Sequence, residues 1–252
     1  MIHFVGAGPG NVDLITVKGR KLLEETDVII YAGSLVSSEH LEFAKEGCEF
    51  YNSASMNLDE VLEVMERANE DGKDVVRLHT GDPSIYGAIQ EQMDNLEKMG
   101  IEYEVIPGVS SFVAAASAIK REFTLPDVTQ TVILTRLAGR TGVPEDEDLE
   151  NLAKHRASMA IFLSVKSIDG VVAKLKAGYG SGKTPIAVVY KATWEDQKII
   201  IGTLDDIAEK VKSEKIIKTA QILVGDFIDT EYSLSKLYDR SFTHEYRIGR
   251  DD

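Results

Sequence analysis

Three short glycine-bearing segments contain the residue types that could bind a small ligand. They are Gly6–Gly10 (Gly-Ala-Gly-Pro-Gly), Thr80–Pro83 (Thr-Gly-Asp-Pro) and Pro107–Ser111 (Pro-Gly-Val-Ser-Ser), named here the first, second and third glycine corners. Glycine lets the backbone approach a ligand closely or adopt a positive φ, and proline restricts the loop. The carboxylate of Asp82 can accept hydrogen bonds from an amine or a hydroxyl. These residues predict ligand contacts made largely by the backbone.

Three segments resemble better-known motifs, and each match is incomplete. Gly6–Gly10 lacks the third glycine of a dinucleotide fingerprint, because Asn11 stands there. Gly108–Phe112 lacks the second glycine of a hydrolase nucleophile elbow, so its serines are better explained as caps of a helix that could bind a ligand. Gly180–Thr184 has Ala177 where a phosphate loop needs glycine. NAD binding, a serine hydrolase and an NTPase are therefore not predicted.

Metal-ligating residues show no spacing typical of a site. The histidines stand at positions 3, 40, 79, 155 and 244, too far apart along the chain for a local motif. For His79, beside the second glycine corner, a structural role is preferred over a place at the site. A single cysteine, Cys48, excludes an internal disulfide and a multi-cysteine metal centre and is expected to be a small buried residue. We predict no protein-held metal.

The composition is that of a soluble globular chain. The 252 residues include 43% hydrophobic and 28% charged residues, which argues against disorder. The net charge of −14 opposes binding to nucleic acid or to an anionic membrane and tolerates a cationic ligand. No apolar run reaches the ~18 residues of a spanning helix, and we predict no signal peptide from the residues before the first glycine corner. A cytoplasmic protein is predicted.

The glycine corners share one position in the predicted fold, because each follows a strand and precedes a helical pattern. The predicted strands of this half are 2–5, 27–31, 74–79 and 103–106, and helical patterns run to about 25 and over 58–68, 84–99 and 109–119. Such alternation predicts a mostly parallel sheet covered on both faces. In an open α/β sheet, loops at the carboxyl ends of the strands line the ligand crevice.

The second half predicts a mixed sheet with helices. The pattern breaks from 120 to 130 around Pro126, and the strands that follow come closer together: 131–134, 159–164, 186–190, 198–201 and 221–224. Residues 194–197 form a hairpin-like connection, 141–150 an acidic loop, and 237–252 a tail without periodicity that is expected to be partly disordered. We predict an α/β fold with domains at 1–120 and 127–236 and a ligand cleft between them.

With these corners in this order, the sequence resembles the S-adenosylmethionine-dependent tetrapyrrole methylases. The resemblance spans about residues 1–235, and its ordered motifs are Val5–Gly10 with Asp13, Leu14, Thr16 and Gly19, then Gly81–Pro83 with Tyr86 and Gly87, Ile106–Ser111, Thr203–Leu204 and Thr219–Gly225. Within the family, Tyr31–Val36 and Thr135–Thr141 are similar to the subgroup that methylates C11 of precorrin-4 or cobalt-precorrin-4 in cobalamin synthesis. Ser110–Ser111 and Leu163 depart from common family residues without removing a functional group.

The resemblance implies that S-adenosyl-L-methionine binds in the interdomain cleft and leaves as S-adenosyl-L-homocysteine. The implied contacts are Pro9, Gly81, Asp82, Pro83, Ile85, Tyr86, Ser110, Ser111, Leu163, Tyr190, Ala192, Thr219 and Ala220. Arg136 and Arg140 would bind carboxylates of the tetrapyrrole substrate, which arginine does bidentately. The alternative is a surface pair that contacts Glu145–Asp148. Asp13 either faces the substrate or stabilises a helix N-terminus.

The resemblance also implies a homodimer, and it leaves the acceptor open. A diphthine synthase would share the fold but methylate a protein histidine, which does not require carboxylate-binding arginines. A corrinoid-binding protein without activity would bind tetrapyrrole but not the methyl donor. The sequence does not distinguish a cobalt-containing substrate from a metal-free one.

Overall fold

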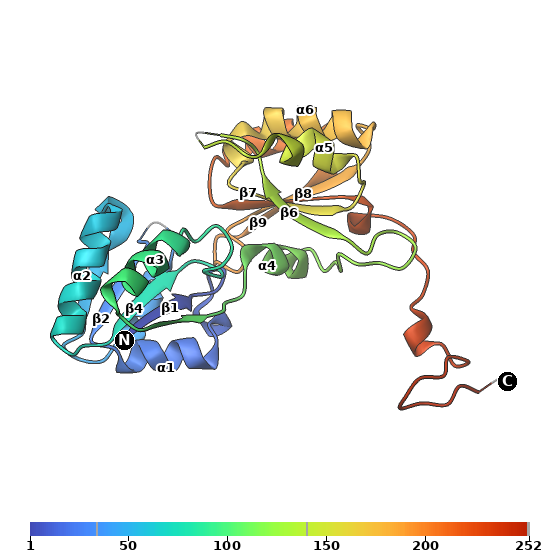
Figure 1. Cartoon of the computed structure of the whole chain (residues 1–252). Coiled ribbons are helices and arrows are strands. Elements are labelled where there is room, and N and C mark those ends of the chain that lie inside the picture. The colour runs from blue at the N-terminus through green and yellow to red at the C-terminus, as the bar shows by residue number, and fades with distance from the viewer. Residues whose placement is uncertain (34, 140, 251–252) are drawn as a thin grey trace. The chain divides into compact units, whose positions relative to one another are not determined.

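The computed structural model describes residues 1–33, 35–139 and 141–250 and divides into two compact units. The first unit contains residues 1–114 and 191–197, and the second contains 115–190 and the chain from 198 onward. Both units combine one sheet with helices, as the predicted α/β class requires (Figure 1). No sequence pattern signalled that 191–197 folds with the first unit.

The sheet of the first unit is parallel throughout, with strand order β3-β2-β4-β1-β5. Its strands are β1 (Ile2–Gly6), β2 (Val28–Tyr31), β3 (Glu49–Asn52), β4 (Val75–His79) and β5 (Tyr103–Ile106). The predicted parallel sheet is confirmed. The edge strand β3 was not predicted, because its residues are mostly exposed and show no hydrophobic pattern.

Helices cover both faces of this sheet (Figure 1). The helix α2 (Leu58–Glu70) begins at a capping box between Asn57 and Glu60 and buries its apolar stripe with α3 (Gln90–Met99) on one face. The helix α1 (Val17–Glu25) and the 3-10 segment Ser38–Phe43 pack on the other face. The helix α4 (Ser111–Ala118) follows the third glycine corner.

The predicted helix over 84–99 is too long at its N-terminus, because α3 begins only at Gln90. The carboxylate of Asp82 accepts a hydrogen bond from the backbone N–H of Ser84 at 2.8 Å and forms a turn. Tyr86 and Ala88 then have left-handed backbone conformations, which a helix does not tolerate.

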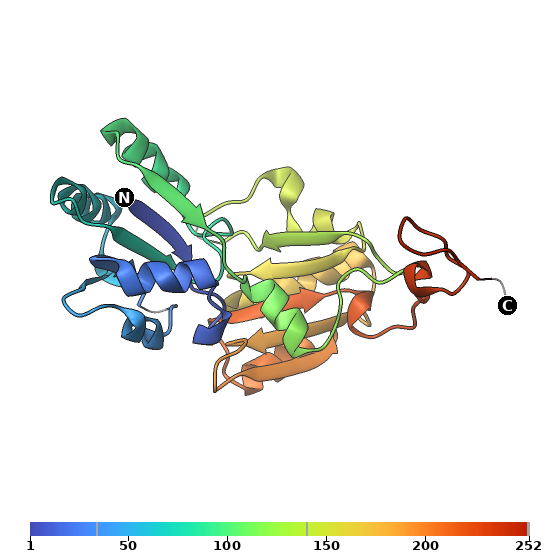
Figure 2. The same ribbon diagram turned by 90° about the horizontal axis from the view of Figure 1, so that it is seen from below.

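The sheet of the second unit is mixed, with strand order β6-β7-β10-β8-β9 (Figure 2). Its strands are β6 (Val132–Arg136), β7 (Ser158–Phe162), β8 (Pro185–Tyr190), β9 (Lys198–Thr203) and β10 (Ala220–Val224). Only β6 and β7 pair in parallel among these strands. The helices α5 (Leu149–Ala153), α6 (Ile168–Tyr179) and α7 (Ile207–Ser213) supply buried apolar residues to its core. The prediction of a mixed sheet with helices is confirmed.

Two segments expected to be irregular contain local structure. The acidic loop 141–150 ends inside α5, which begins at Leu149. In the tail, one Nη atom of Arg247 donates hydrogen bonds to the carbonyl oxygens of Leu237, Asp239 and Phe242 at 2.7, 2.5 and 3.2 Å. Within the described ranges, no helix is long and apolar enough to cross a membrane.

Candidate functional site

The three glycine corners meet in the first unit at the carboxyl edge of its sheet. Gly8 and Gly81 exchange backbone hydrogen bonds of 3.2 and 2.8 Å, which join the first corner to the second. The Oδ2 atom of Asp82 accepts a hydrogen bond from the N–H of Gly108 at 2.9 Å, which joins the second corner to the third. The predicted clustering of these loops is therefore present in the structure.

Close backbone packing requires glycine at two positions in this cluster. A Cβ on Gly108 would lie 2.1 Å from the carbonyl oxygen of Gly81, and one on Gly6 would lie 2.7 Å from the Cα of Gly108. The obstructing atoms belong to the backbone and cannot rotate away. These glycines therefore let the corners touch.

Several implied donor contacts lie on uncommon backbone. In the first unit, Gly81 has φ +63° and Tyr86 has φ +57°, and the Tyr86 side chain is 46% exposed. In the second unit, Leu163 has φ +55° and is 76% exposed, and Thr219 has φ +54°. Left-handed non-glycine residues are uncommon and concentrate at ligand sites, and exposed apolar side chains offer a surface for an apolar group. Each unit thus contains strained, accessible residues at the implied positions.

The other implied donor contacts are distributed over both units. In the first unit, those buried are Pro9, Pro83, Ser110 and Ala192, and those partly buried are Asp82, Ile85 and Ser111. In the second unit, Tyr190 at the end of β8 pairs with Ala220 at the start of β10. The structure therefore brings the last two together, although they are 30 positions apart in sequence.

The polar residues expected to face the substrate differ in their surroundings. Asp13 is exposed in the first turn of a three-residue 3-10 helix, Val12–Leu14, which is much shorter than a helix with a full macrodipole. Arg136 donates from its two Nη atoms to the carbonyl oxygens of Thr141 and Gly142 at 3.1 and 2.6 Å. These contacts are with backbone carbonyl oxygens rather than with Glu145–Asp148, the partners in the alternative interpretation. Arg140 lies outside the described residues.

A buried basic pair beneath the second corner was not predicted. Burial lowers the pKa of Arg77 to about 10. Burial and the nearby charge of Arg77 lower the pKa of His79 to about 3, so this imidazole is neutral. Among the described residues, its Nε2 atom has no hydrogen-bond partner. The alternation of side chains along β4 places Arg77 and His79 on the same face as Val75, the face covered by α2 and α3.

Trp194 is another residue of the first unit that sequence analysis did not connect to the site. Its indole N–H donates a hydrogen bond to the carbonyl oxygen of Pro9 at 2.9 Å. The only feature of the sequence that could have drawn attention to Trp194 is that it is the sole tryptophan of the chain.

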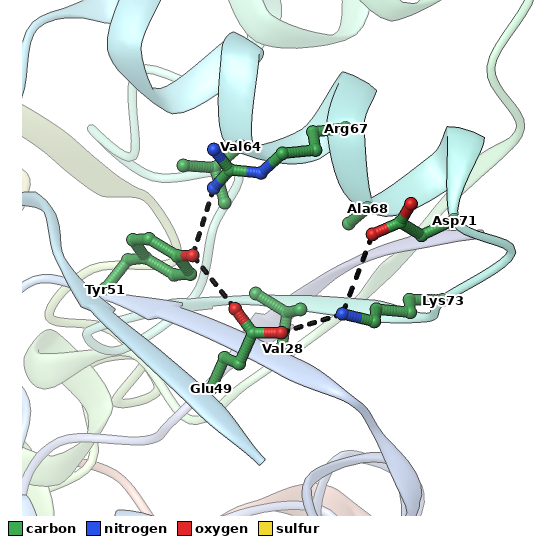
Figure 3. Close-up of a pocket in the computed structure, with 8 residues that line it drawn as sticks. All are labelled: Val28, Glu49, Tyr51, Val64, Arg67, Ala68, Asp71 and Lys73. Atoms are coloured by element: carbon green, nitrogen blue, oxygen red, sulfur yellow. Dashed lines mark hydrogen bonds and ion pairs between the residues drawn. The ribbon is translucent and has the colours of Figure 1, made fainter. Parts of the chain in front are cut away.

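A separate recess lies away from the glycine corners, between β3 and α2 (Figure 3). Glu49 and Lys73 form an ion pair of 2.8 Å there, and Tyr51 connects Glu49 to Arg67 by hydrogen bonds of 3.0 Å. Its cavity volume of about 10 Å³ suits one water molecule at most. Within the described ranges, no group of three metal-ligating side chains lies close enough to hold an ion.

The sequence of the chain matches a known family over residues 1–208, described as tetrapyrrole (corrin/porphyrin) methylases. The chain belongs to this family. The match includes the three glycine corners, Arg136 and the connection 191–197. The match thus covers the ordered motifs as far as Thr203–Leu204, and the motif Thr219–Gly225 lies beyond it.

Relatives of this methylase with assigned names are similar over almost the whole chain. One, "cobalt-precorrin-4 C(11)-methyltransferase" of Methanocaldococcus jannaschii, is 60% identical over 98% of this chain and 95% of its own length. Another, "precorrin-4 C(11)-methyltransferase" of Pseudomonas aeruginosa, is 46% identical over 98% of this chain and 99% of its own. An X-ray structure of cobalt precorrin-4 methyltransferase, a cobalamin biosynthetic enzyme, is 48% identical with a TM-score of 0.89, covering 91% of this chain and 96% of that one.

Proposed function

We propose that this methylase transfers a methyl group from S-adenosyl-L-methionine to C11 of precorrin-4 or cobalt-precorrin-4 in cobalamin biosynthesis. The observation that carries the proposal is 60% identity over 98% of the chain to a protein bearing that name. The motif-bearing corners are consistent with it, because they lie in contact at one edge of a parallel sheet.

The proposed contacts of the methyl donor are the residues that the family resemblance implies. They are Pro9, Gly81, Asp82, Pro83, Ile85, Tyr86, Ser110, Ser111, Leu163, Tyr190, Ala192, Thr219 and Ala220. The residues present fit such a group, because exposed Tyr86 and Leu163 offer apolar surface on strained backbone. The carboxylate of Asp82 and the net charge of −14 on the chain favour a cationic ligand.

In this mechanism the protein binds and orients the methyl donor and the tetrapyrrole and forms no covalent bond with either. Bound S-adenosyl-L-methionine supplies an activated methyl group on a sulfonium. The contacts among Gly6, Gly81 and Gly108 hold the corners rigidly, so the donor-binding backbone is ordered before the ligand arrives. Apolar side chains such as Leu163 would exclude water from the reacting groups.

Arg136 and Arg140 are proposed to bind substrate carboxylates. The contacts of Arg136 with its own loop leave further guanidinium N–H donors for a ligand. Asp13, exposed beside the first corner, is proposed to face the substrate and to accept a proton or to balance developing positive charge.

The decisive experiment incubates the purified protein with donor labelled in its methyl group and with either precorrin-4 or cobalt-precorrin-4. We expect a singly methylated product with the label at C11, and the relative turnover identifies the preferred substrate. Absence of label transfer to both would refute the proposed activity.

Substituting both arginines tests the substrate assignment. In the Arg136→Ala/Arg140→Ala variant, kcat/KM for the tetrapyrrole should fall at least about a hundredfold, since the variant loses two charged hydrogen bonds of about 1.5–3 kcal/mol each. Affinity for S-adenosyl-L-homocysteine, measured by calorimetry, should stay within about twofold. Arg121→Ala removes an exposed arginine of the same unit and is the control.

The same measurements distinguish the two alternative functions. A diphthine synthase would methylate a protein histidine instead of the tetrapyrrole. A corrinoid-binding protein without activity would give no heat with S-adenosyl-L-homocysteine in calorimetry.

A cytoplasmic homodimer completes the proposal. Its support is the family to which the chain belongs. Sedimentation equilibrium should give twice the chain mass of 27.8 kDa, and a single-chain mass at micromolar concentration would contradict the dimer.

A further inference from the structure

The connection between β8 and β9 forms two hydrogen bonds, one with the first glycine corner and one with Asn11, the residue that follows it. Trp194 donates its indole N–H to the carbonyl oxygen of Pro9 at 2.9 Å. The backbone N–H of Asn11 donates to the Oγ1 atom of Thr193 at 3.0 Å. These bonds join segments more than 180 positions apart, and both segments belong to the first unit.

The indole of Trp194 also packs directly on the backbone of the corner. A Cβ on Gly10 would lie 2.2 Å from the Cδ1 and Nε1 atoms of the indole, so only glycine leaves room for this ring. The ammonium group of Lys191 lies over the indole, 5.1 Å from the ring centroid, and forms an ion pair of 2.6 Å with Asp196. The ring therefore contacts both the first corner and its own connection.

The connection itself has an uncommon backbone. Lys191 and Thr193 have φ +45° and +73°, a region that β-branched residues such as threonine rarely occupy. The N–H of Thr193 donates to the Oε1 atom of Gln197 at 2.7 Å. Ala192, a proposed donor contact, is buried between the two left-handed residues. Such a backbone persists only where surrounding contacts determine it.

We infer that Trp194 is a positioning residue for methyl-donor binding, which fixes Pro9 through its indole N–H and Ala192 through the folded connection. This inference rests on the proposed function, because Pro9 and Ala192 are proposed donor contacts. Trp194 orders the first corner before the donor binds, so it acts on donor affinity more than on the turnover of bound reactants.

The first test replaces Trp194 with phenylalanine, which keeps an aromatic ring and removes the N–H donor. The dissociation constant for S-adenosyl-L-homocysteine and the KM for the donor should rise about five- to tenfold, while kcat at saturating donor changes less than about twofold. Tyr179→Phe is the matched control, because it removes a donor to the backbone carbonyl of Ala157 in the second unit. The control should lower thermal stability without changing donor affinity.

A double-mutant cycle isolates the contact with Gly10. Gly10→Ala alone places a methyl group against the indole and should weaken donor binding. In a Trp194→Ala background the same substitution meets no indole, so its effect should shrink at least threefold. Equal effects in the two backgrounds would contradict the inferred role.

A third measurement needs no variant, because Trp194 is the sole tryptophan. Its intrinsic fluorescence should change on titration with S-adenosyl-L-homocysteine and saturate at the calorimetric dissociation constant. If the wild-type protein gives no calorimetric binding, the proposed function fails. If it binds while the fluorescence is unchanged, or if Trp194→Phe binds as tightly as wild type, only the inference about Trp194 fails.

Discussion

Asp82 joins two glycine corners through a hydrogen bond of 2.9 Å from the Gly108 N–H to its Oδ2 atom. The Oδ1 atom of the same carboxylate accepts from the N–H of Ser84 at 2.8 Å. The sequence suggested a carboxylate available to an amine or hydroxyl of a ligand, whereas both oxygens already bind backbone. Each oxygen keeps a second lone pair, so this structural role is compatible with ligand contact.

Replacing Asp82 with asparagine should separate the corners, because an amide nitrogen cannot accept a backbone hydrogen bond. The free energy of unfolding should fall by about 1–3 kcal/mol, the cost of leaving the partly buried Gly108 N–H unpaired. Urea denaturation measures this loss. Asp146→Asn, at an exposed position in a 3-10 turn, should change stability by less than about 0.5 kcal/mol. Equal stability of the two variants would argue against the structural role of Asp82.

Gly108→Ala should destabilise the protein strongly, since its Cβ would lie 2.1 Å from the carbonyl oxygen of Gly81. Relief requires a backbone shift, and we expect a loss of at least about 2 kcal/mol. Gly142→Ala is the control, because nothing lies within 4 Å of the position of its added Cβ. Thermal unfolding distinguishes the variants, and similar melting temperatures would show that the corners do not pack this closely.

His79 should make stability depend on pH in the mildly acidic range. Its pKa is about 3 in the folded protein, against an ordinary value of 6.5. Below pH 6.5 the unfolded chain therefore binds a proton that the folded protein does not. The free energy of unfolding is therefore not reduced by His79 above about pH 6.5. As the pH falls from 6.5 toward 3, His79 lowers it by about 1.4 kcal/mol per pH unit at most.

Urea denaturation at pH 7 and pH 5 measures this dependence. From pH 6.5 to 5 the expected loss from His79 is about 2 kcal/mol. His79→Phe should remove that part of the pH dependence, whereas His155→Asn, at an exposed histidine, should retain it. Parallel pH profiles for wild type and His79→Phe would show that His79 titrates normally in the folded protein.

Gln92 should control the order of the loop that carries Tyr86. Its Oε1 atom accepts from the Nε of Arg77 at 3.3 Å, and its Nε2 atom donates to the carbonyl oxygen of Ala88 at 2.9 Å. In Gln92→Glu a carboxylate pairs with the buried Arg77 but cannot donate to Ala88. We expect amide hydrogen exchange over 86–89 to accelerate about fivefold, from the loss of about 1 kcal/mol, while global stability is retained.

The control for this prediction is Asn95→Asp on the same helix. Asn95 also donates to a carbonyl oxygen four residues earlier, that of Glu91 at 2.7 Å, but at an exposed position. The Asn95→Asp variant should leave amide hydrogen exchange over 86–89 unchanged. If Gln92→Glu also leaves it unchanged, the hydrogen bond to Ala88 does not order the loop.

Much of the fold follows from local patterns. Buried strands such as Val28–Tyr31 read as apolar runs, and the stripe of α2 repeats with helical spacing, so both were predicted closely. The exposed edge strand Glu49–Asn52 was missed because its pairing with β2, rather than its residue types, makes it a strand. The start of α3 was misplaced because the Asp82 turn and the left-handed residues after it override helix propensity.

The sequence alone determined the alternation of strands and helices, and therefore that each glycine corner follows a parallel strand and that the corners share one sheet edge. Only the tertiary structure decided which atoms meet there: Asp82 with Gly108, and Trp194 with Pro9. The physical reason is the separation along the chain over which each kind of information acts. Periodicity along the chain reports which side of an element is buried, whereas a hydrogen bond between residues 185 positions apart depends on the path of the folded backbone between them.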